Sequence, residues 1–469
     1  MPTTPPSPQP VTPPAARPAE RTSPWRYGVG MFGTSIPINL IKGSMLYFYV
    51  TLLGMPATTF AAVYAVYGII DAIDNPVFGY ISDRTRTRWG RRRPYLVIGA
   101  LALLGSMIAL FLVPGEVAAE TTSLVVWFAF FAILSEMADS LINANYGALL
   151  PELFPEEKRR AIANSARQGF QLVAMIIALG LTPVLAQNVL GCSGEGCADP
   201  TVGYTRLAVI YGVIATIVII YMALGVRENP KISDTPQPRF FRSIGEILTN
   251  RYFWTVGVVS ALYGTAMGLL LGGLQNFVRY TLNGDGLTAT ILQVTVIFAS
   301  IGFLMVWTKI VERKGAAWTW RVALVVAALG FIPLYFAHDL LTGIIGGLAV
   351  ALGYSGLLAT NDLIAARVLD EDAARNGVHR EGIFLSAFGV FGRLSGLVVA
   401  LALASLTWFF GFESGANPGP QPDVAFRFYL SVYPAVLLGI GAIIARVITV
   451  PGAAASPESV AAVAEELGD

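Results

Sequence analysis

The sequence predicts an all-α integral membrane protein, with twelve transmembrane helices arranged as two pseudo-symmetric bundles of six. Of its 469 residues, 55% are apolar and 13% are charged, whereas soluble domains carry about 25% charged residues. Apolar stretches of roughly 20 residues, each long enough to cross about 30 Å of hydrocarbon, alternate with short polar breaks. The longest internal polar segment divides these stretches six and six. This composition argues strongly against a water-soluble enzyme.

The chain divides into five parts. Residues 1–25 contain nine prolines and almost no large apolar side chain, so we expect a disordered cytoplasmic tail. Residues 26–226 and 251–449 are the two bundles, 227–250 a cytoplasmic linker and 450–469 a cytoplasmic C-terminal tail. The expected helices lie at 27–53, 56–82, 94–114, 121–151, 160–188, 203–226, 252–280, 286–311, 317–336, 340–369, 381–410 and 424–449.

The distribution of basic residues predicts that both termini are cytoplasmic. With the amino terminus inside, 25 of the 31 Lys and Arg residues lie on the inner side, and only Arg206, Arg279 and Arg427 lie on the outer side. This pattern predicts a multi-pass protein of the cell (inner) membrane. Cys192 and Cys197 fall in an outer loop, where a disulfide and two free thiols both remain open.

Ionisable groups inside the helices are the main functional signal, because each costs ~2.5 to 3.5 kcal/mol at a helix centre. Asp71, Asp74 and Asn75 share one face of the helix expected at 56–82. Two carboxylates and an amide suit a small hard cation, and Asp71 alone suits a proton. The alternative is a pair of acids neutralised by neighbouring basic groups.

The helix expected at 121–151 repeats this polar pattern. Glu136, Asp139, Asn143 and Tyr146 follow one another at i, i+3, i+7 and i+10, with Ser140 beside them. A second polar stripe at the same depth predicts that the two helices face each other or share a cavity. For Glu136, a transport role and a structural ion pair with a base remain equally open.

Three basic residues inside helices complete the charged set. Lys42 lies in the first helix, Arg167 in the fifth and Arg393 in the eleventh. Arginine offers a bidentate fork for a carboxylate, a phosphate or sugar hydroxyls. An interaction of Arg393 with the acids of the first bundle would join the two halves. Lys42 either binds an anionic group or neutralises Asp71 or Asp139.

Three charged cytoplasmic segments, 83–93, 152–160 and 370–381, fit membrane topology and contact with lipid headgroups. We also hypothesise that they form ion-paired latches that close the inner side. The residues of these gating loops are Asp83, Arg84, Arg91, Arg92, Asp370, Arg380 and Glu381.

Three motifs carry a family resemblance: DAIDNPVFGYISDRTRTRWGRRRPYL, NYGALLPELFPEEKRRA and LDEDAARNGVHREG. With them, the stretch from Trp25 to Arg446 resembles the glycoside-pentoside-hexuronide:cation symporter family, the branch of the major facilitator superfamily that includes melibiose permease. The resemblance implies two six-helix bundles around a central site. By resemblance, Asp71 and Ser140 match sodium-site residues, Arg167 matches an arginine near the sugar, and Arg393 replaces a lysine.

The sequence also departs from the family pattern. The second acid of the second helix has moved, so that Asp74 and Asn75 stand in the opposite order. By resemblance, two sugar-binding aspartates fall on Ser35 and Asn143, and Lys42 takes the place of a tyrosine. These changes argue against a melibiose-like galactoside and leave room for an acidic sugar or another anionic solute.

The resulting hypothesis is a symporter that couples a sugar or glycoside to Na⁺ or H⁺ by alternating access. The alternatives are a uniporter and a cation-coupled carrier of an anionic or amphiphilic solute, such as a hexuronide or lysolipid. We expect a monomer in the lipid bilayer, with no enzymatic activity, no nucleic-acid partner, and no cofactor or metal beyond Na⁺. The cation-coupling candidates are Asp71, Asp74, Asn75, Ser140 and Asp139, and the substrate-binding candidates are Ser35, Lys42, Asn143, Tyr146, Arg167 and Arg393.

Overall fold

The structure is a computed structural model, and every regular element in its described part is a helix. Residues 1–21 of the predicted N-terminal tail, the C-terminal tail and most of the linker lie outside the described residues, as do Cys192, Cys197 and Arg380. The expected disordered tail ends too late, because the helix α1 already begins at Pro24. The described residues are 22–154, 156–191, 199–226, 228, 248–376 and 381–447.

The first half of the chain begins with a membrane helix made of three consecutive pieces and contains a fifth membrane helix that is also interrupted. Its elements are α1 (Pro24–Gly28), α2 (Gly30–Leu46), the π-helix η1 (Tyr47–Leu52), α3 (Ala57–Arg84), α4 (Arg93–Phe111), α5 (Gly115–Ala119), α6 (Thr121–Leu153), α7 (Glu157–Met175), η2 (Ile176–Leu181), α8 (Thr182–Val184), η3 (Leu185–Val189) and α9 (Pro200–Gly225).

The second half has longer uninterrupted helices. Its elements are α11 (Arg251–Tyr280), α12 (Gly286–Lys314), α13 (Ala316–Gly330), α14 (Ile332–Tyr335), α15 (Leu340–Asn376), α16 (Glu381–Phe410), α17 (Pro422–Arg427), η5 (Phe428–Val432) and α18 (Tyr433–Val447).

Local chemistry explains where several helices begin and end. Asn250 caps α11 by accepting from the Tyr252 N–H at 2.9 Å, and Asp285 caps α12 by accepting from the Thr288 N–H at 3.1 Å. The Thr288 hydrogen bond also holds the pKa of Asp285 below its usual value, because it favours the charged carboxylate. Gly315 separates α12 from α13 at a φ of +77°, which glycine adopts without strain.

Each of the twelve expected ranges coincides with a helical stretch, and the all-α membrane fold is confirmed. Among the described residues, ten helical stretches are long and apolar enough to cross a membrane. The two others are the first stretch and α3, in which the apolar stretch found among the described residues is Ala57–Asp71. The number of twelve crossings therefore stays a prediction.

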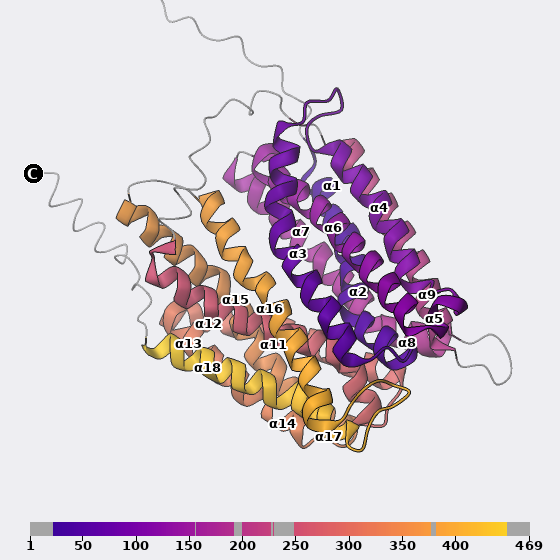
Figure 1. Cartoon of the computed structure of the whole chain (residues 1–469). Helices are drawn as coiled ribbons and strands as arrows, with labels where there is room; N and C mark the ends of the chain where they lie inside the picture. The colour runs from indigo at the N-terminus through magenta and orange to yellow at the C-terminus, as the bar shows by residue number, and fades with distance from the viewer. Residues whose placement is uncertain are drawn as a thin grey trace, which may run out of the picture.

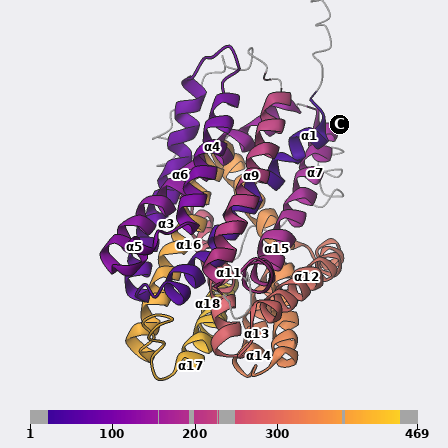
Figure 2. The ribbon, with the colours of Figure 1, turned by 90° about the vertical axis from the view of Figure 1, so that its right-hand side faces the viewer.

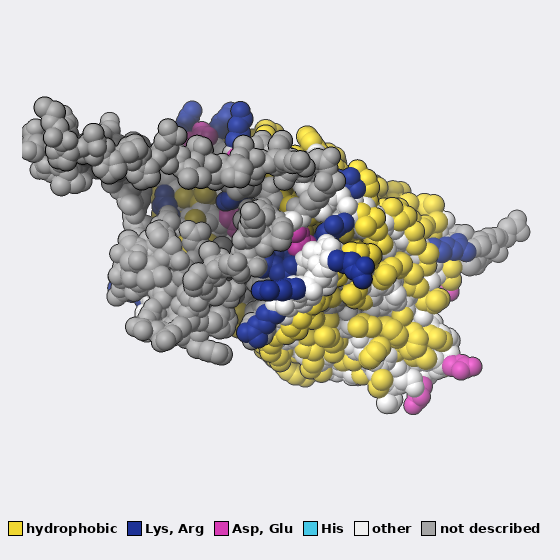
Figure 3. All heavy atoms as spheres, turned by 90° about the horizontal axis from the view of Figure 1, so that it is seen from above, with side chains coloured by type: hydrophobic (Ala, Val, Ile, Leu, Met, Phe, Trp, Pro, Cys, Tyr) yellow, Lys and Arg dark blue, Asp and Glu magenta, His cyan; other side chains and the backbone are white. Residues whose placement is uncertain are grey.

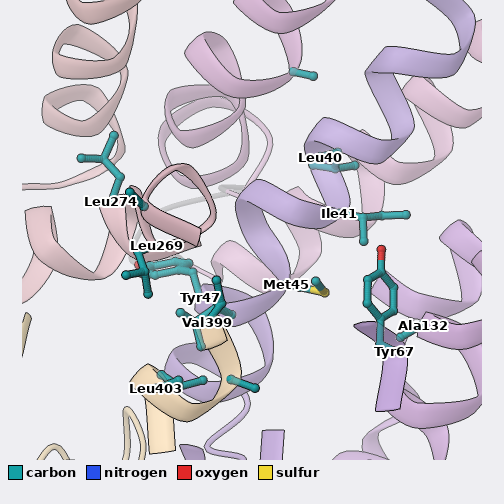
Figure 4. Close-up of a cluster of buried hydrophobic side chains, with 14 of the residues drawn as sticks. Leu40, Ile41, Met45, Tyr47, Tyr67, Ala132, Leu269, Leu274, Val399 and Leu403 are labelled. Atoms are coloured by element: carbon teal, nitrogen blue, oxygen red, sulfur yellow. The ribbon is translucent and has the colours of Figure 1, made fainter. Parts of the chain in front are cut away.

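The helices gather in two groups, with α1 to α9 on one side and α11 to α18 on the other (Figure 1). A second view, turned by 90°, shows α3 in front of α16 and α7 running toward α12 (Figure 2). α3 packs along α16, and α2 packs along α11. Apolar side chains from both groups lie in this region, including Met45, Tyr47, Leu269, Val399 and Leu403 (Figure 4).

Polar contacts join the two groups at the end where α5, α14 and α17 lie (Figure 1). Gln275 of α11 donates to the Gly43 carbonyl at 2.9 Å and to the Ser44 hydroxyl at 3.2 Å. The Ala57 N–H donates to the Glu413 carbonyl at 2.7 Å. In the predicted orientation this closed end is extracellular.

At the opposite end the two groups move apart, since α3 and α16 converge in the lower part of Figure 1 and separate in its upper part. Lys and Arg side chains gather on this upper face (Figure 3). In the predicted orientation the upper face is cytoplasmic.

Candidate functional site

An ion-pair cluster links the two groups of helices. The Arg393 Nη1 of α16 lies 2.9 Å from Asp71 Oδ1 and 3.3 Å from Asp74 Oδ1 of α3, and it also donates to the Asp71 main-chain carbonyl. The side chains of Arg393, Asp71 and Asp74 are 26%, 16% and 6% exposed, so the cluster is not fully enclosed by protein. The base and the acids of this bridge belong to different halves of the chain.

Glycines bring α3 and α16 close enough for this contact. A Cβ added to Gly68 would lie 3.6 Å from the Gly396 backbone. Gly68 precedes Asp71 by three residues and Gly396 follows Arg393 by three, so the approach of the two backbones is about one turn from the ion pair.

A second set of charged groups lies in the first half of the chain. Glu136 of α6 is 2% exposed and accepts a hydrogen bond from the Tyr67 hydroxyl of α3. The charges of Glu136, Asp71 and Asp139 act on the Lys42 ammonium of α2, with Glu136 the strongest. In the described part of the chain, Oδ1 of Asp139 is buried without a hydrogen-bond partner. The structure therefore brings Lys42 among acids of both predicted stripes.

Three other predicted site residues lie on the same helices. Ser140 of α6 is buried next to Asp139, and Ser35 of α2 is buried two turns before Lys42. The Asn143 Nδ2 donates to the main-chain carbonyl of Asp139 at 3.1 Å. The side chain of Asn75 lies outside the described residues.

Tyr146 has a different environment. Its ring stacks on Tyr27 with centroids 4.6 Å apart, and each hydroxyl donates to the main-chain carbonyl of the other residue, at 3.0 and 2.9 Å. The Arg167 charge acts on both tyrosines, and its Nε is buried without a hydrogen-bond partner in the described part of the chain. In this conformation the Tyr146 side chain is thus engaged within the first half.

A hollow of about 590 Å³ lies along the face of α7 that carries Ala166, Gly169 and Phe170. Most of its walls are apolar, and Trp25 and Phe170 meet edge to face at a centroid distance of 6.4 Å. The remaining lining residues are Ala161, Ile162, Ser165 and Val173.

The loop arginines form contacts within the first half. Arg91 pairs with Glu152, and the Arg92 Nε lies 3.2 Å from the same carboxylate. Glu228, just after α9, accepts from the backbone N–H groups of Arg91, Arg92 and Arg93 at 2.6, 3.0 and 2.9 Å. A latch between the halves stays a prediction, because Arg380 and the side chains of Asp83, Asp370 and Glu381 lie outside the described residues, and Arg84 is exposed.

Sequence reasoning missed an acid in α15. Asp362 is exposed within a membrane-spanning stretch, and its charge acts on Tyr263 of α11. The Tyr263 ring stacks near that of Tyr354, and Ser260 donates to Asn361. The sequence did contain a signal for this residue, because Asn361 and Asp362 lie inside the helix expected at 340–369. A charge on Asp362 carries the same free-energy cost in a membrane as the other acids.

The donor set bears on the kind of ion that can bind. Among the described residues, no group of three or more His, Cys, Asp or Glu side chains converges as a metal site. Asp71 and Asp74 supply carboxylate oxygens, and a sodium ion would draw its further oxygens from hydroxyl, amide or carbonyl groups nearby. A proton would require one carboxylate alone.

The family model described as MFS/sugar transport protein matches residues 26–451. The chain belongs to this family. This membership confirms the resemblance to major facilitator symporters found in the motifs, and it identifies the protein as a multi-pass membrane transporter and not an enzyme.

Curated relatives agree with this assignment. The isoprimeverose transporter of Lactiplantibacillus pentosus is 24% identical over 408 residues, which cover 83% of each chain. The uncharacterized symporter YjmB of Bacillus subtilis (strain 168) is 23% identical over 436 residues, which cover 88% of this chain and 89% of the relative.

Solved structures share the fold. A D-xylose-proton symporter superposes with a TM-score of 0.67 at 15% identity and covers 90% of this chain and 96% of its own. A bacterial homolog of the human lysosomal transporter Spinster, in an inward-facing and unoccupied conformation, has a TM-score of 0.67 at 14% identity and covers 92% and 97%. At these identities the likeness shows the fold alone.

Proposed function

We propose that this major facilitator is a secondary active symporter that couples the movement of a sugar or glycoside to a cation, Na⁺ or H⁺. The single observation that carries the proposal is the partly exposed contact between Asp71 and Asp74 of α3 and Arg393 of α16. Acids at this depth are costly, and pairing with a base from the other half makes their neutralisation depend on conformation. The names of the isoprimeverose transporter and the D-xylose-proton symporter support a sugar.

In the proposed cycle, a cation binds at Asp71 and Asp74, with Asn75, Ser140 and Asp139 as further candidate ligands. Its charge replaces that of Arg393, which releases the bridge between the halves. Substrate then binds between the halves, and the loaded carrier changes its open side. Each ligand favours the state that binds the other, a reciprocal coupling of about 1 to 3 kcal/mol.

The proposed substrate contacts in the first half are Ser35, Lys42, Asn143 and Arg167, with Tyr146 available only if its contact with Tyr27 opens. Hydroxyl and amide groups suit sugar hydroxyls, whereas Lys42 and Arg167 suit an anionic group. We place the carrier in the cell (inner) membrane as a monomer with both termini cytoplasmic. The Lys and Arg side chains on the upper face support this orientation (Figure 3).

One observation favours a second candidate, an anionic amphiphile. The hollow of about 590 Å³ along α7 has mostly apolar walls, and Arg167 follows its lining residue Ala166 in the sequence. An acidic headgroup at Arg167 with an apolar group in this hollow would satisfy both features. Lysolipids and acidic glycosides with an apolar aglycone belong to this class.

The test is uptake by proteoliposomes of a panel of labelled sugars, acidic sugars and lysolipids, under imposed Na⁺ and proton gradients separately. The wild type should concentrate a sugar under one of the gradients, and Asp71→Asn should abolish concentration. Glu116→Gln, which removes an exposed acid of α5 far from the cluster, is the matched control and should behave as the wild type.

Two results would count against this function. Uptake that ignores both gradients would identify a uniporter. Concentration by Asp71→Asn that equals the wild type would show that the proposed cation site is wrong.

A further inference from the structure

We propose that the second half of the chain carries its own carbohydrate subsite, formed by Tyr263 of α11 with Tyr354, Asn361 and Asp362 of α15. Its ligand is a neutral pyranose ring with neighbouring hydroxyl groups. This inference rests on the proposed sugar transport and adds the part of the site that would recognise an uncharged sugar unit.

The first step is the exposure of Asp362. This residue lies in α15 within a stretch that is long and apolar enough to cross a membrane, and its side chain is exposed. A carboxylate that faced lipid at this depth would carry a large free-energy cost, so acids in such helices face protein or water. The exposed face of α15 at Asp362 is therefore a water-facing surface.

The second step places Tyr263 on the same surface. α11 turns Gly264 toward Ser395 of α16, with 3.3 Å from an added Cβ to the hydroxyl, and it turns Val259 toward Gly441 of α18. The side of α11 that remains carries Ser260 and Tyr263, which are three residues apart and so share a face. Ser260 donates to Asn361, the residue next to Asp362, so this side of α11 faces the part of α15 that carries the acid.

Contacts at two levels hold α11 and α15 in register. The Tyr263 and Tyr354 rings lie nearly parallel, with centroids 6.1 Å apart and planes at 24°. One turn away along α11, the Ser260 hydroxyl donates to Asn361 Oδ1 at 3.0 Å. Because this bond uses the amide oxygen of Asn361, the amide nitrogen of the same side chain can donate to a ligand. The wall is thus preorganised before any ligand binds.

These groups match the chemistry of a pyranose. One face of the ring carries C–H groups that pack on an aromatic side chain, while its edge carries hydroxyl groups. A carboxylate accepts hydrogen bonds from two neighbouring hydroxyls, and an amide nitrogen donates to a third oxygen. Binding sites for small molecules commonly combine aromatic walls with a few such polar groups. The geometry points to a neutral sugar unit in the second half and leaves the cationic Lys42 and Arg167 of the first half for another part of the substrate.

The experiment is equilibrium exchange of labelled D-xylose, D-glucose and D-galactose in proteoliposomes, with equal cation concentrations on both sides. For the sugar that the wild type exchanges best, Asp362→Asn and Tyr354→Leu should each raise the half-saturation concentration at least tenfold. Tyr354→Phe keeps the ring and should stay within about twofold, as should Glu116→Gln. An unchanged half-saturation in both Asp362→Asn and Tyr354→Leu would overturn the subsite.

A second measurement holds even where these variants fold poorly. In a Cys192→Ser, Cys197→Ser background, Asp362→Cys should react with a hydrophilic maleimide in the membrane, because the surface is wet. Absence of reaction in a folded carrier would overturn the proposal. The two proposals fail differently: exchange without response to a gradient refutes cation coupling alone, whereas no sugar movement by the wild type refutes the sugar function itself.

Discussion

Replacing Arg393 by glutamine tests whether this arginine competes with the coupling cation for Asp71 and Asp74. The substitution removes the charge that lies 2.9 Å from Asp71 and 3.3 Å from Asp74, and it leaves the acids of the first half in position. In the proposed cycle, a cation displaces Arg393 of the wild type when it binds. In the variant this competition is absent, so the cation should bind more tightly.

The structure sets the size of this effect. At 2.9 Å and an effective dielectric constant of 20, the attraction of one ion pair is about 6 kcal/mol before desolvation is subtracted. Exposed pairs contribute about 0 to 1 kcal/mol, whereas breaking a buried pair costs about 3 to 5 kcal/mol. The Arg393 and Asp71 side chains are 26% and 16% exposed, between these cases, so we take about 1 to 3 kcal/mol. The half-saturation concentration of the cation should fall about 5- to 150-fold.

The assay is a cation titration of the purified carrier, followed by the rise in its melting temperature, which measures binding without transport. Na⁺ is titrated at fixed pH, and protons are titrated in its absence. Arg167→Gln makes the same change at a base outside the ion-pair cluster and should keep the wild-type midpoint. If Arg393→Gln also keeps the wild-type midpoint, or weakens cation binding, then Arg393 does not compete with the cation and the reasoning is refuted.

Three further substitutions test other parts of the structure. Gln275→Leu removes four hydrogen bonds between the halves at the closed end, donated to Gly43 and Ser44 and accepted from Tyr204 and Gln187, each contributing about 0.5 to 1.5 kcal/mol. In a Cys192→Ser, Cys197→Ser background, labelling of Thr51→Cys from outside should therefore increase about fivefold or more, and equal labelling would contradict this closure. Glu228→Gln replaces a charged acceptor of three backbone N–H groups at the start of α4 by a neutral one, which weakens these hydrogen bonds. The melting temperature should fall, while the half-saturation concentration of the sugar should stay the same. A change in the half-saturation concentration alone would argue for a direct role of Glu228 in binding. Gly203→Ala places a Cβ 1.9 Å from the Ala186 carbonyl and should destabilise the fold, whereas Gly105→Ala, with open space around it, should not; equal expression and melting temperature of the two would count against the packing of α9 on η3.

Helix positions were predictable because the free energy of placing a side chain in a membrane is summed residue by residue along one helix. The stretch expected at 381–410 is α16 with the same ends, and the stretch expected at 286–311 is α12 with a slightly later end. The interruptions were not predictable in this way. The π-helix at Tyr47–Leu52 and the broken course of α7 to η3 depend on how neighbouring helices pack, and hydropathy does not contain that information.

The candidate site residues also divide into those that a single segment reveals and those that depend on packing between helices. Asp71 and Asp74 could be recognised from the cost of their charges alone, and Asp362 carried the same signal but was overlooked. The environment of Tyr146 had no local signal. The polar stripe of α6 predicted that Tyr146 contacts the substrate. In the structure, the Tyr146 hydroxyl instead donates to the carbonyl of Tyr27, which lies 119 residues away in the sequence.

The sequence by itself determined that this protein is a helical membrane transporter with acids inside its apolar helices, because hydrophobic length and the cost of a buried charge are properties of single segments. Only the tertiary structure decided which basic groups pair with those acids. Arg393 and Asp71 are 322 residues apart, and they meet because two glycine-lined helices pack closely. The partner of a buried charge depends on packing between helices, so no single segment can specify it.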